Sequence, residues 1–261
     1  MGVKRPSLWN TVLELRTAPE LLTFVAAAPV LLGVLPRGEG RHVLVLPGFT
    51  AGDTSTAALR GALRGLGHRP HGWGLGRNLG PTDEVLDGIV LRLDELVTRN
   101  GGPIDIVGWS LGGIYARELA RLAPDHVRQV ITLGSPFQVT GPESTNAAAA
   151  WRRVSDRHST RAMVPRLPDH AREPVPVPTT AVYSRTDGVA HWSDCIDPPR
   201  ARAENVEVRG SHCGLGHNPA VLLVIADRLA QADGQWRPFE PPAVARALFP
   251  EPTHLALGAL A

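Results

Sequence analysis

A serine lies between two glycines in the segment Gly-Trp-Ser-Leu-Gly at residues 108–112. Residues 104–107 before it predict a strand, and residues 114–122 after it predict a helix. A Gly-x-Ser-x-Gly sequence at such a turn exposes the serine above the sheet and places the next N–H at a helix N-terminus, where it can stabilise an oxyanion. We therefore expect Ser110 to be a nucleophile in acyl transfer and Leu111 to supply one oxyanion donor. The alternative is a glycine-rich turn with an incidental serine.

Two further strand ends carry the residues that such a serine needs. A serine hydroxyl requires a neighbouring base, usually histidine, and the histidine requires a carboxylate that orients it. Asp187 follows the strand predicted at 179–183, and His212 follows the strand predicted at 206–208. Because active sites of open α/β sheets lie at the carboxyl ends of the strands, we expect Asp187 and His212 to meet Ser110 there. Other candidates of the same types lie nearby in the chain: Asp194, Asp197, His191 and His217.

Aromatic residues also follow the predicted strands. Phe49 comes after Pro47 and Gly48 in the loop that follows the strand predicted at 42–46. Gly48 permits close backbone approach, so we expect the N–H of Phe49 to be the second oxyanion donor. Three other rings are candidates for an apolar substrate-binding site, although rings at such positions also pack in cores. They are Trp109, Phe137 and Trp192.

Strands and helices alternate along most of the chain. The predicted strands lie at 42–46, 68–75, 104–107, 127–133, 179–183 and 206–208, and the predicted helices at 57–66, 83–99, 114–122 and 219–229. This alternation predicts an α/β domain at residues 41–261, with a mostly parallel six-stranded sheet and helices on both faces. The irregular stretch at about 137–178 is too long for a plain loop, and we expect it to be a cap or lid with short helices of its own.

Residues 1–40 predict a separate N-terminal helical segment. Its apolar stretch, residues 21–35, is shorter than the ~20 residues that span a bilayer and is interrupted by Pro29. We expect helices packed on the domain, and the alternatives are a hydrophobic anchor or an atypical export signal. An apolar segment together with a lid suits a lipidic ester and contact with a lipid surface. The protein is then soluble and either cytoplasmic or exported.

The composition is that of an ordinary folded domain. Hydrophobic residues make up 43% and charged residues 20% of the 261 residues, and the formal net charge is +2. No run of Lys and Arg forms the basic stripe that nucleic-acid binding needs, so we expect no nucleic-acid partner. A chain of this size needs no metal or disulfide to hold its fold, and the chemistry above needs no cofactor. The oligomeric state stays open.

The two cysteines, Cys195 and Cys213, lie in the segments that carry the predicted acid and base. A disulfide between them would tie these segments together and would imply an oxidising compartment. Two free thiols are the alternative. The nearby histidines do not complete a zinc-ligand spacing, so we expect no metal site.

Five segments of the chain resemble one superfamily. They are LPGF at 46–49, GWSLGG at 108–113, LGSPF at 133–137, SRTDG at 184–188 and SHCGL at 211–215. Together they resemble the α/β-hydrolase superfamily, and its lipase-like and esterase-like members, over roughly residues 41–230. The six predicted strands are similar to those of the small bacterial lipases. The resemblance implies a serine hydrolase that cleaves small-molecule or lipidic carboxylic esters, with Ser110, Asp187 and His212 as its triad.

The sequence departs from that resemblance at one place. Many lipases have His-Gly in the first oxyanion loop, whereas this chain has Pro47 and Gly48. The superfamily also contains amidases, thioesterases, acyltransferases and members without activity, because the fold alone does not determine the substrate. These activities remain alternatives, as does a non-catalytic binding protein on the same scaffold. Triad residues at three separate strand ends argue against the last of these.

Overall fold

The computed structural model describes residues 5–139, 142–159 and 168–250. Its centre is a six-stranded sheet with the order β2-β1-β3-β4-β5-β6, in which all neighbours are parallel. The strands are β1 (His42–Leu46), β2 (Arg69–Gly72), β3 (Ile104–Trp109), β4 (Val127–Leu133), β5 (Thr179–Tyr183) and β6 (Ala203–Glu207). The predicted sheet is confirmed, with β2 shorter and β6 earlier in the chain than the sequence pattern indicated.

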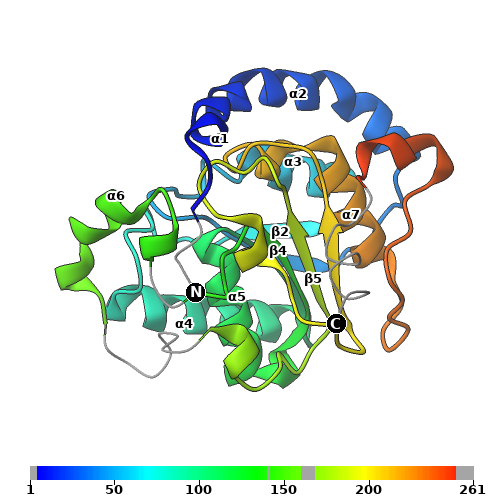
Figure 1. Cartoon of the computed structure of the whole chain (residues 1–261). Coiled ribbons are helices and arrows are strands. Elements are labelled where there is room, and N and C mark those ends of the chain that lie inside the picture. The colour runs from blue at the N-terminus through cyan, green and yellow to red at the C-terminus, as the bar shows by residue number, and fades with distance from the viewer. Residues whose placement is uncertain (1–4, 140–141, 160–167, 251–261) are drawn as a thin grey trace.

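Helices cover both faces of the sheet, as the alternation predicted (Figure 1). Side chains along β1 point alternately to opposite faces, so Val43 and Val45 belong to one buried core and Leu44 and Leu46 to the other. The first core also includes residues of α2, α3 and α7, and the second includes residues of α4 and α5. These helices are α2 (Thr17–Val34), α3 (Ala57–Gly65), α4 (Asp83–Asn100), α5 (Leu111–Leu122) and α7 (Pro219–Ala230).

Capping residues set where several helices begin and end. Thr82 caps α4 by accepting the N–H of Val85, and Asn218 caps α7 by accepting the N–H of Ala220. Helix α4 ends at Gly101, which has a φ of 74°. The α/β domain also contains short 3₁₀ helices, which include η2 (Pro124–His126), η6 (Trp192–Cys195), η7 (Leu215–His217) and η8 (Ala243–Leu248).

The stretch at about 137–178 carries short helices, as its length suggested. They are η3 (Pro142–Ser144), α6 (Ala148–Arg152), η4 (Ser155–Arg157) and η5 (Asp169–Ala171), and residues 160–167 lie outside the described part. The ring of Trp151 lies 5.1 Å from the ring of Phe49, and the N–H of Ser159 donates to the carbonyl of Pro81 at 2.7 Å. The insertion therefore packs against the loops that follow β1 and β2. Its role as a lid stays a prediction.

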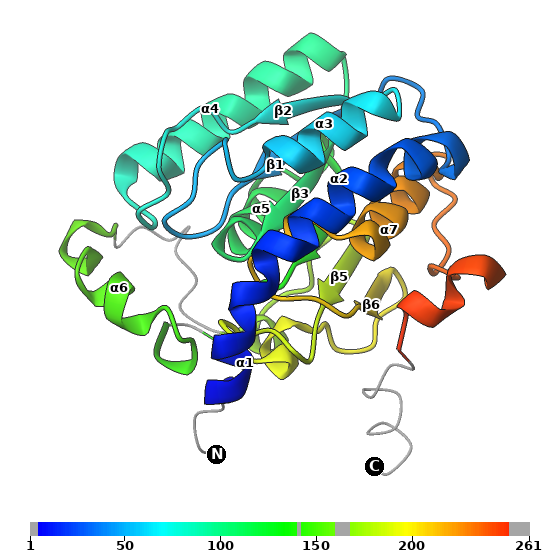
Figure 2. The same cartoon turned by 90° about the horizontal axis from the view of Figure 1, so that it is seen from above.

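The N-terminal segment runs along the outside of the molecule (Figure 2). It consists of α1 (Leu8–Leu13), η1 (Glu14–Arg16) and α2. Phe24 of α2 is buried in the core, whereas most other large apolar side chains of the segment are exposed. The stretch Leu8–Val34 is long and apolar enough to cross a membrane by length and composition. In the structure α2 contacts α3 and α7, and polar side chains of the segment contact the loops described below.

Candidate active site

The turn between β3 and α5 holds Ser110 in a conformation that is rare for a residue with a side chain. Its φ is 53° and its ψ is −120°, a strained backbone that costs about 1–3 kcal/mol. The flanking glycines are required by close approach. A Cβ at Gly108 would overlap the backbone of Gly113, and a Cβ at Gly112 would overlap the backbone of Leu46. The motif therefore folds as the sharp strand-to-helix turn that its sequence predicted.

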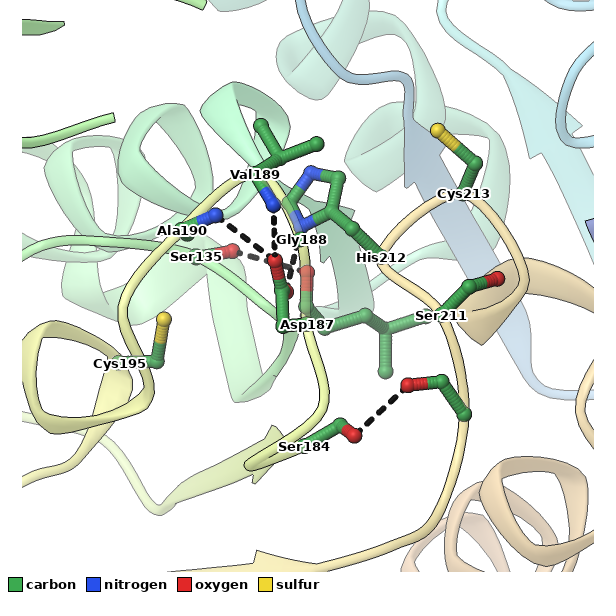
Figure 3. Close-up of polar contacts among 12 residues, drawn as sticks. Ser135, Ser184, Asp187, Gly188, Val189, Ala190, Cys195, Ser211, His212 and Cys213 are labelled. Carbon is green, nitrogen blue, oxygen red and sulfur yellow. Dashed lines mark hydrogen bonds and ion pairs between the residues drawn. The ribbon is translucent and has the colours of Figure 1, made fainter. Parts of the chain in front are cut away.

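The loops after β5 and β6 bring Asp187 and His212 into direct contact (Figure 3). The Nδ1 of His212 lies 2.6 Å from the Oδ2 of Asp187, and both side chains are buried. The other carboxylate oxygen of Asp187 accepts the N–H groups of Val189 at 2.8 Å and Ala190 at 2.7 Å. Because an ionised carboxylate only accepts hydrogen bonds, the Nδ1 of His212 carries the proton and its Nε2 can act as a base.

The end of β4 connects this pair to Ser110. The N–H of Ser110 donates to the carbonyl of Leu133 at 2.8 Å. The next residue, Gly134, has a φ of 53°, and a Cβ there would lie 3.1 Å from the Oδ2 of Asp187 and 3.2 Å from the Nδ1 of His212. The structure therefore places Ser110 after β3 and the Asp187–His212 pair on the loops after β5 and β6, all at the same carboxyl edge of the sheet.

The surroundings of His212 favour its charged form. Burial of the ring disfavours the imidazolium, but the carboxylates of Asp187 and Glu14 outweigh that effect, and the pKa of His212 is raised above its usual value. A base that accepts a proton during a reaction becomes an imidazolium. This site is therefore arranged to stabilise the histidine after proton transfer.

The loop after β1 passes close to Ser110. A Cβ at Gly48 would lie 3.2 Å from the Cβ of Ser110, a tight contact that glycine avoids. Within the described residues, neither the N–H of Phe49 nor that of Leu111 donates to another protein group. The N–H of Leu111 is among the first of α5, where helix N–H groups lack partners. Both predicted oxyanion donors thus belong to backbone beside the serine.

Asn78 supports the loop after β1, and our sequence reasoning missed it. Its side-chain N–H donates to the carbonyl of Pro47 at 3.0 Å, and its backbone carbonyl accepts the N–H of Thr50 at 2.7 Å. Thr50 has a φ of 62°, one of two positive φ values among the described non-glycine residues. An asparagine in a loop of glycine and proline carries no sequence signal that it reaches back to another loop.

The predicted substrate-binding rings have other neighbours in the structure. Trp109 is buried, and its indole N–H donates to the carbonyl of His212 at 3.0 Å. Phe137 is buried beneath the guanidinium of Arg117, 3.8 Å from the ring centroid. These two rings therefore pack within the supporting structure, and their role in substrate binding stays a prediction. Trp192 stacks on Tyr183 with ring centroids 6.0 Å apart, and its role in binding stays a prediction.

The alternative acids and bases are occupied elsewhere. Asp197 forms a buried ion pair with Arg117, with a shortest distance of 2.5 Å. The Nε2 of His217 lies 3.2 Å from the carbonyl of Thr17, and the Nδ1 of His191 lies 2.8 Å from the hydroxyl of Ser193. Asp194 lies in η6. The geometry therefore favours Asp187 and His212 over each alternative.

The predicted disulfide is wrong. Cys195 and Cys213 are both free, and they lie on opposite sides of the Asp187–His212 pair (Figure 3). The thiol of Cys195 is buried and lies 3.6 Å from the carbonyl of His191. Cys213 is exposed at the surface, but partial desolvation and the nearby Glu14 raise the pKa of its thiol to about 12, so this thiol is protonated at neutral pH. Among the described residues, no three His, Cys, Asp or Glu side chains form a cluster that could hold a metal.

Comparisons with known proteins agree with this architecture. A model of the alpha/beta hydrolase family matches residues 18–259. A pimeloyl-[acyl-carrier protein] methyl ester esterase of Aromatoleum aromaticum is 35% identical over 104 residues, which are 31% of this chain and 41% of that protein. A monoacylglycerol lipase of Paleococcus ferrophilus superposes with a TM-score of 0.53 at 13% identity, covering 75% of this chain and 96% of that one. Aspergillus fumigatus lipase B gives 0.58 at 16% identity, over 77% and 55%. At these identities the two structures show the fold alone.

Proposed function

Because the chain belongs to the alpha/beta hydrolase family, we propose that it is a serine hydrolase that cleaves carboxylic esters through an acyl-enzyme on Ser110. The observation that carries this proposal is the buried Asp187–His212 pair, with 2.6 Å between the two side chains, at the sheet edge that presents Ser110. A serine without such a base has a weakly nucleophilic hydroxyl. A family name alone would not distinguish a hydrolase from a binding protein.

Each residue has a distinct role in the proposed reaction. The Nε2 of His212 takes the hydroxyl proton as Ser110 attacks the ester carbonyl, and Asp187 keeps the imidazole in the required tautomer. The N–H groups of Phe49 and Leu111 hold the oxyanion, and the loss of one such donor typically costs about 3–4 kcal/mol of barrier. His212 then protonates the leaving alcohol and activates the water that releases the acid. No step requires a metal or cofactor.

The substrate that fits these surroundings has an apolar acyl chain. The rings of Phe49 and Trp151 lie together beside the loop that approaches Ser110, where they offer an apolar surface to an acyl group. The methyl ester esterase that is 35% identical over 104 residues supports an ester bond as the target. We expect the insertion at about 137–178 to act as a lid over the acyl chain of the bound substrate. In that case Trp151→Ala lowers activity on long acyl chains more than on acetate esters.

The outer face of the N-terminal segment suits a lipid surface that presents such esters. Its exposed apolar side chains include Leu8, Trp9, Val12, Leu15, Leu22, Val25, Val30 and Val34. Glu14 and Glu20 turn inward to hydrogen-bond with loops of the domain, and the exposed charged residues near the ends of the segment include Arg5, Arg37 and Glu39. An apolar face whose carboxylates turn inward favours contact with the interface of a bilayer.

Vesicle binding tests this contact. The double variant L15E/L22E should lose co-sedimentation with phosphatidylglycerol vesicles, and the control Leu91→Glu, on exposed α4, should keep it. Binding by the double variant equal to that of the wild type would contradict the proposal. A dimer that buries this face, detected by light scattering, would do so as well.

Hydrolysis of p-nitrophenyl esters of increasing acyl length tests the central proposal. The wild type should hydrolyse them, and Ser110→Ala should abolish the activity while remaining folded. Anilide and thioester analogues run alongside separate the esterase from an amidase or a thioesterase. Equal rates of ester hydrolysis in the wild type and Ser110→Ala would contradict the proposal.

A further inference from the structure

One carboxylate from the N-terminal segment joins the two loops that carry the acid and the base. Glu14 lies in η1, between α1 and α2. Its Oε1 accepts the N–H of Gly188 at 2.8 Å and the N–H of His212 at 2.7 Å, and its Oε2 accepts the N–H of Cys213 at 2.9 Å. Gly188 follows Asp187 directly in the chain. Three charge-assisted hydrogen bonds thus hold the backbone on both sides of the Asp187–His212 contact.

The two loops are shaped to receive this segment. A Cβ at Gly188 would overlap the backbone of Asn10, and a Cβ at Gly214 would overlap the carboxylate of Glu20. The Oε1 of Glu20 accepts the N–H of Ser211 at 3.0 Å. Glycine at these two positions therefore leaves space for side chains and backbone of the N-terminal segment. Such fitted contacts argue that the segment belongs to the active-site structure and does more than cover the domain.

We propose that Glu14 is a positioning residue. It fixes the position of the Asp187 loop relative to the His212 loop and places a second negative charge near the imidazole of His212. Its effect on turnover rests on the function proposed above, but its effect on the histidine does not. The loops are also linked directly by the Asp187–His212 contact and by the hydroxyls of Ser184 and Thr186, which donate to the carbonyl of Gly210 at 2.7 Å and 3.2 Å. Glu14 differs from the Gly210 links because it also reaches the backbone that follows the acid and the base, at Gly188 and Cys213.

The charged neighbours of His212 are few. Asp187 faces it from the loop after β5, and Glu14 faces it from η1. Glu20 of α2 contacts Ser211 and is paired with Arg16 at 3.1 Å. Removal of the Glu14 charge therefore leaves Asp187 as the main carboxylate that stabilises the imidazolium.

Two substitutions separate the effect of the negative charge of Glu14 from the effect of its hydrogen bonds to the two loops. Glu14→Gln keeps a carbonyl oxygen that can accept the N–H groups of Gly188 and His212 but removes the charge. Glu14→Ala removes both. The control Glu84→Gln makes the same change of charge on exposed α4, on the other face of the sheet. NMR titration of histidine-labelled protein in the Ser110→Ala background measures the His212 imidazole without any need for activity.

The expected results form a graded series. Glu14→Gln should lower the midpoint of the His212 titration and move the acid limb of kcat/KM to lower pH by the same amount. Its kcat should fall by about 10-fold, and that of Glu14→Ala by up to about 100-fold, with KM little changed. If the hydrogen bonds of Glu14 position the loops, glutamine, which keeps part of them, should retain a higher kcat than alanine.

The outcomes distinguish this inference from the proposed function. If the titration of Glu14→Gln matches that of Glu84→Gln and of the parent, Glu14 does not act on His212 and the inference is wrong. If the midpoint shifts in Glu14→Gln while the wild type hydrolyses no ester, the positioning role stands and the proposed esterase activity fails. If Glu14→Ala does not fold, the His212 titration in Glu14→Gln still tests the inference.

Discussion

The indole N–H of Trp109 donates to the carbonyl of His212 at 3.0 Å. This bond joins the residue before Ser110 to the residue that is its proposed base. The ring also packs so closely on Gly216 that a Cβ there would overlap it. The elbow after β3 and the loop after β6 are therefore coupled through one buried side chain, and the distance between nucleophile and base depends on it.

Trp109→Phe tests this coupling. Phenylalanine keeps most of the buried apolar surface but removes the shorter of two hydrogen bonds to the carbonyl of His212, the other coming from the N–H of Leu215 at 3.4 Å. The loss of one such hydrogen bond costs about 0.5–1.5 kcal/mol. We expect kcat to fall several-fold with KM nearly unchanged, and the midpoint of urea unfolding to decrease. Trp236→Phe, in the C-terminal segment outside the site, is the matched control. Unchanged kcat in Trp109→Phe would show that the bond does not position the histidine.

The pH dependence of activity should follow the raised pKa of His212. Burial lowers that pKa, but Asp187 and Glu14 raise it more, so the imidazole is protonated up to a pH above its ordinary value of 6.5. The base must be neutral to accept a proton, so kcat/KM should fall as the pH decreases through a value above 6.5. A rate profile from pH 5 to 9 measures this limb.

Asp187→Asn provides the comparison for that profile. Removal of the carboxylate should move the limb to lower pH, because the imidazolium loses its nearest negative charge. It should also lower kcat by about 10⁴-fold, since asparagine can favour the wrong tautomer. An acid limb that stays in place in Asp187→Asn would assign it to another group.

Asn78→Ala should weaken oxyanion stabilisation without any contact with the substrate. The substitution removes the hydrogen bond to Pro47 and leaves the N–H of Gly80 and the hydroxyl of Tyr115 without their side-chain acceptor. The loop that carries Phe49 then becomes less ordered, and we expect kcat to fall by about 10-fold. Steady-state kinetics beside Asn100→Ala, at the exposed end of α4, measures the effect. Equal kcat in the two variants would contradict the bracing role.

A buried ion cluster holds α5 to the insertion and to the loop after β5. Arg117 is 1% exposed and pairs with Asp169 and Asp197, both at 2.5 Å. Arg117→Met removes the bidentate cation from Asp197, which keeps the hydroxyl of Thr179, whereas Asp169 keeps its pairs with Arg121 and Arg172. Because Asp197 is then buried without a cation in the described structure, we expect a loss of about 3 kcal/mol in the free energy of unfolding. Urea denaturation measures it, with Arg99→Met, an exposed residue of α4, as the control. A similar midpoint in both variants would show that the cluster adds little to stability.

The sequence by itself determined the architecture and the identity of the central residues. Strand and helix periodicities are local, and they located the six strands to within a few residues. The Gly-x-Ser-x-Gly turn is also local, because its glycines relieve contacts between neighbouring elements. Asp187 and His212 could be chosen because each follows a strand, and parallel strands end at one edge.

Only the tertiary structure decided what supports these residues. Glu14 contacts His212 across 198 residues of chain, and Trp109 contacts it across 103, so neither bond leaves a pattern in the local sequence. The same holds for the two cysteines, which sequence position placed near the same pair but which the loops carry to opposite sides of it. Hydrogen bonds between distant loops depend on how the elements pack. Their partners can be read only after the sheet and its helices are in place.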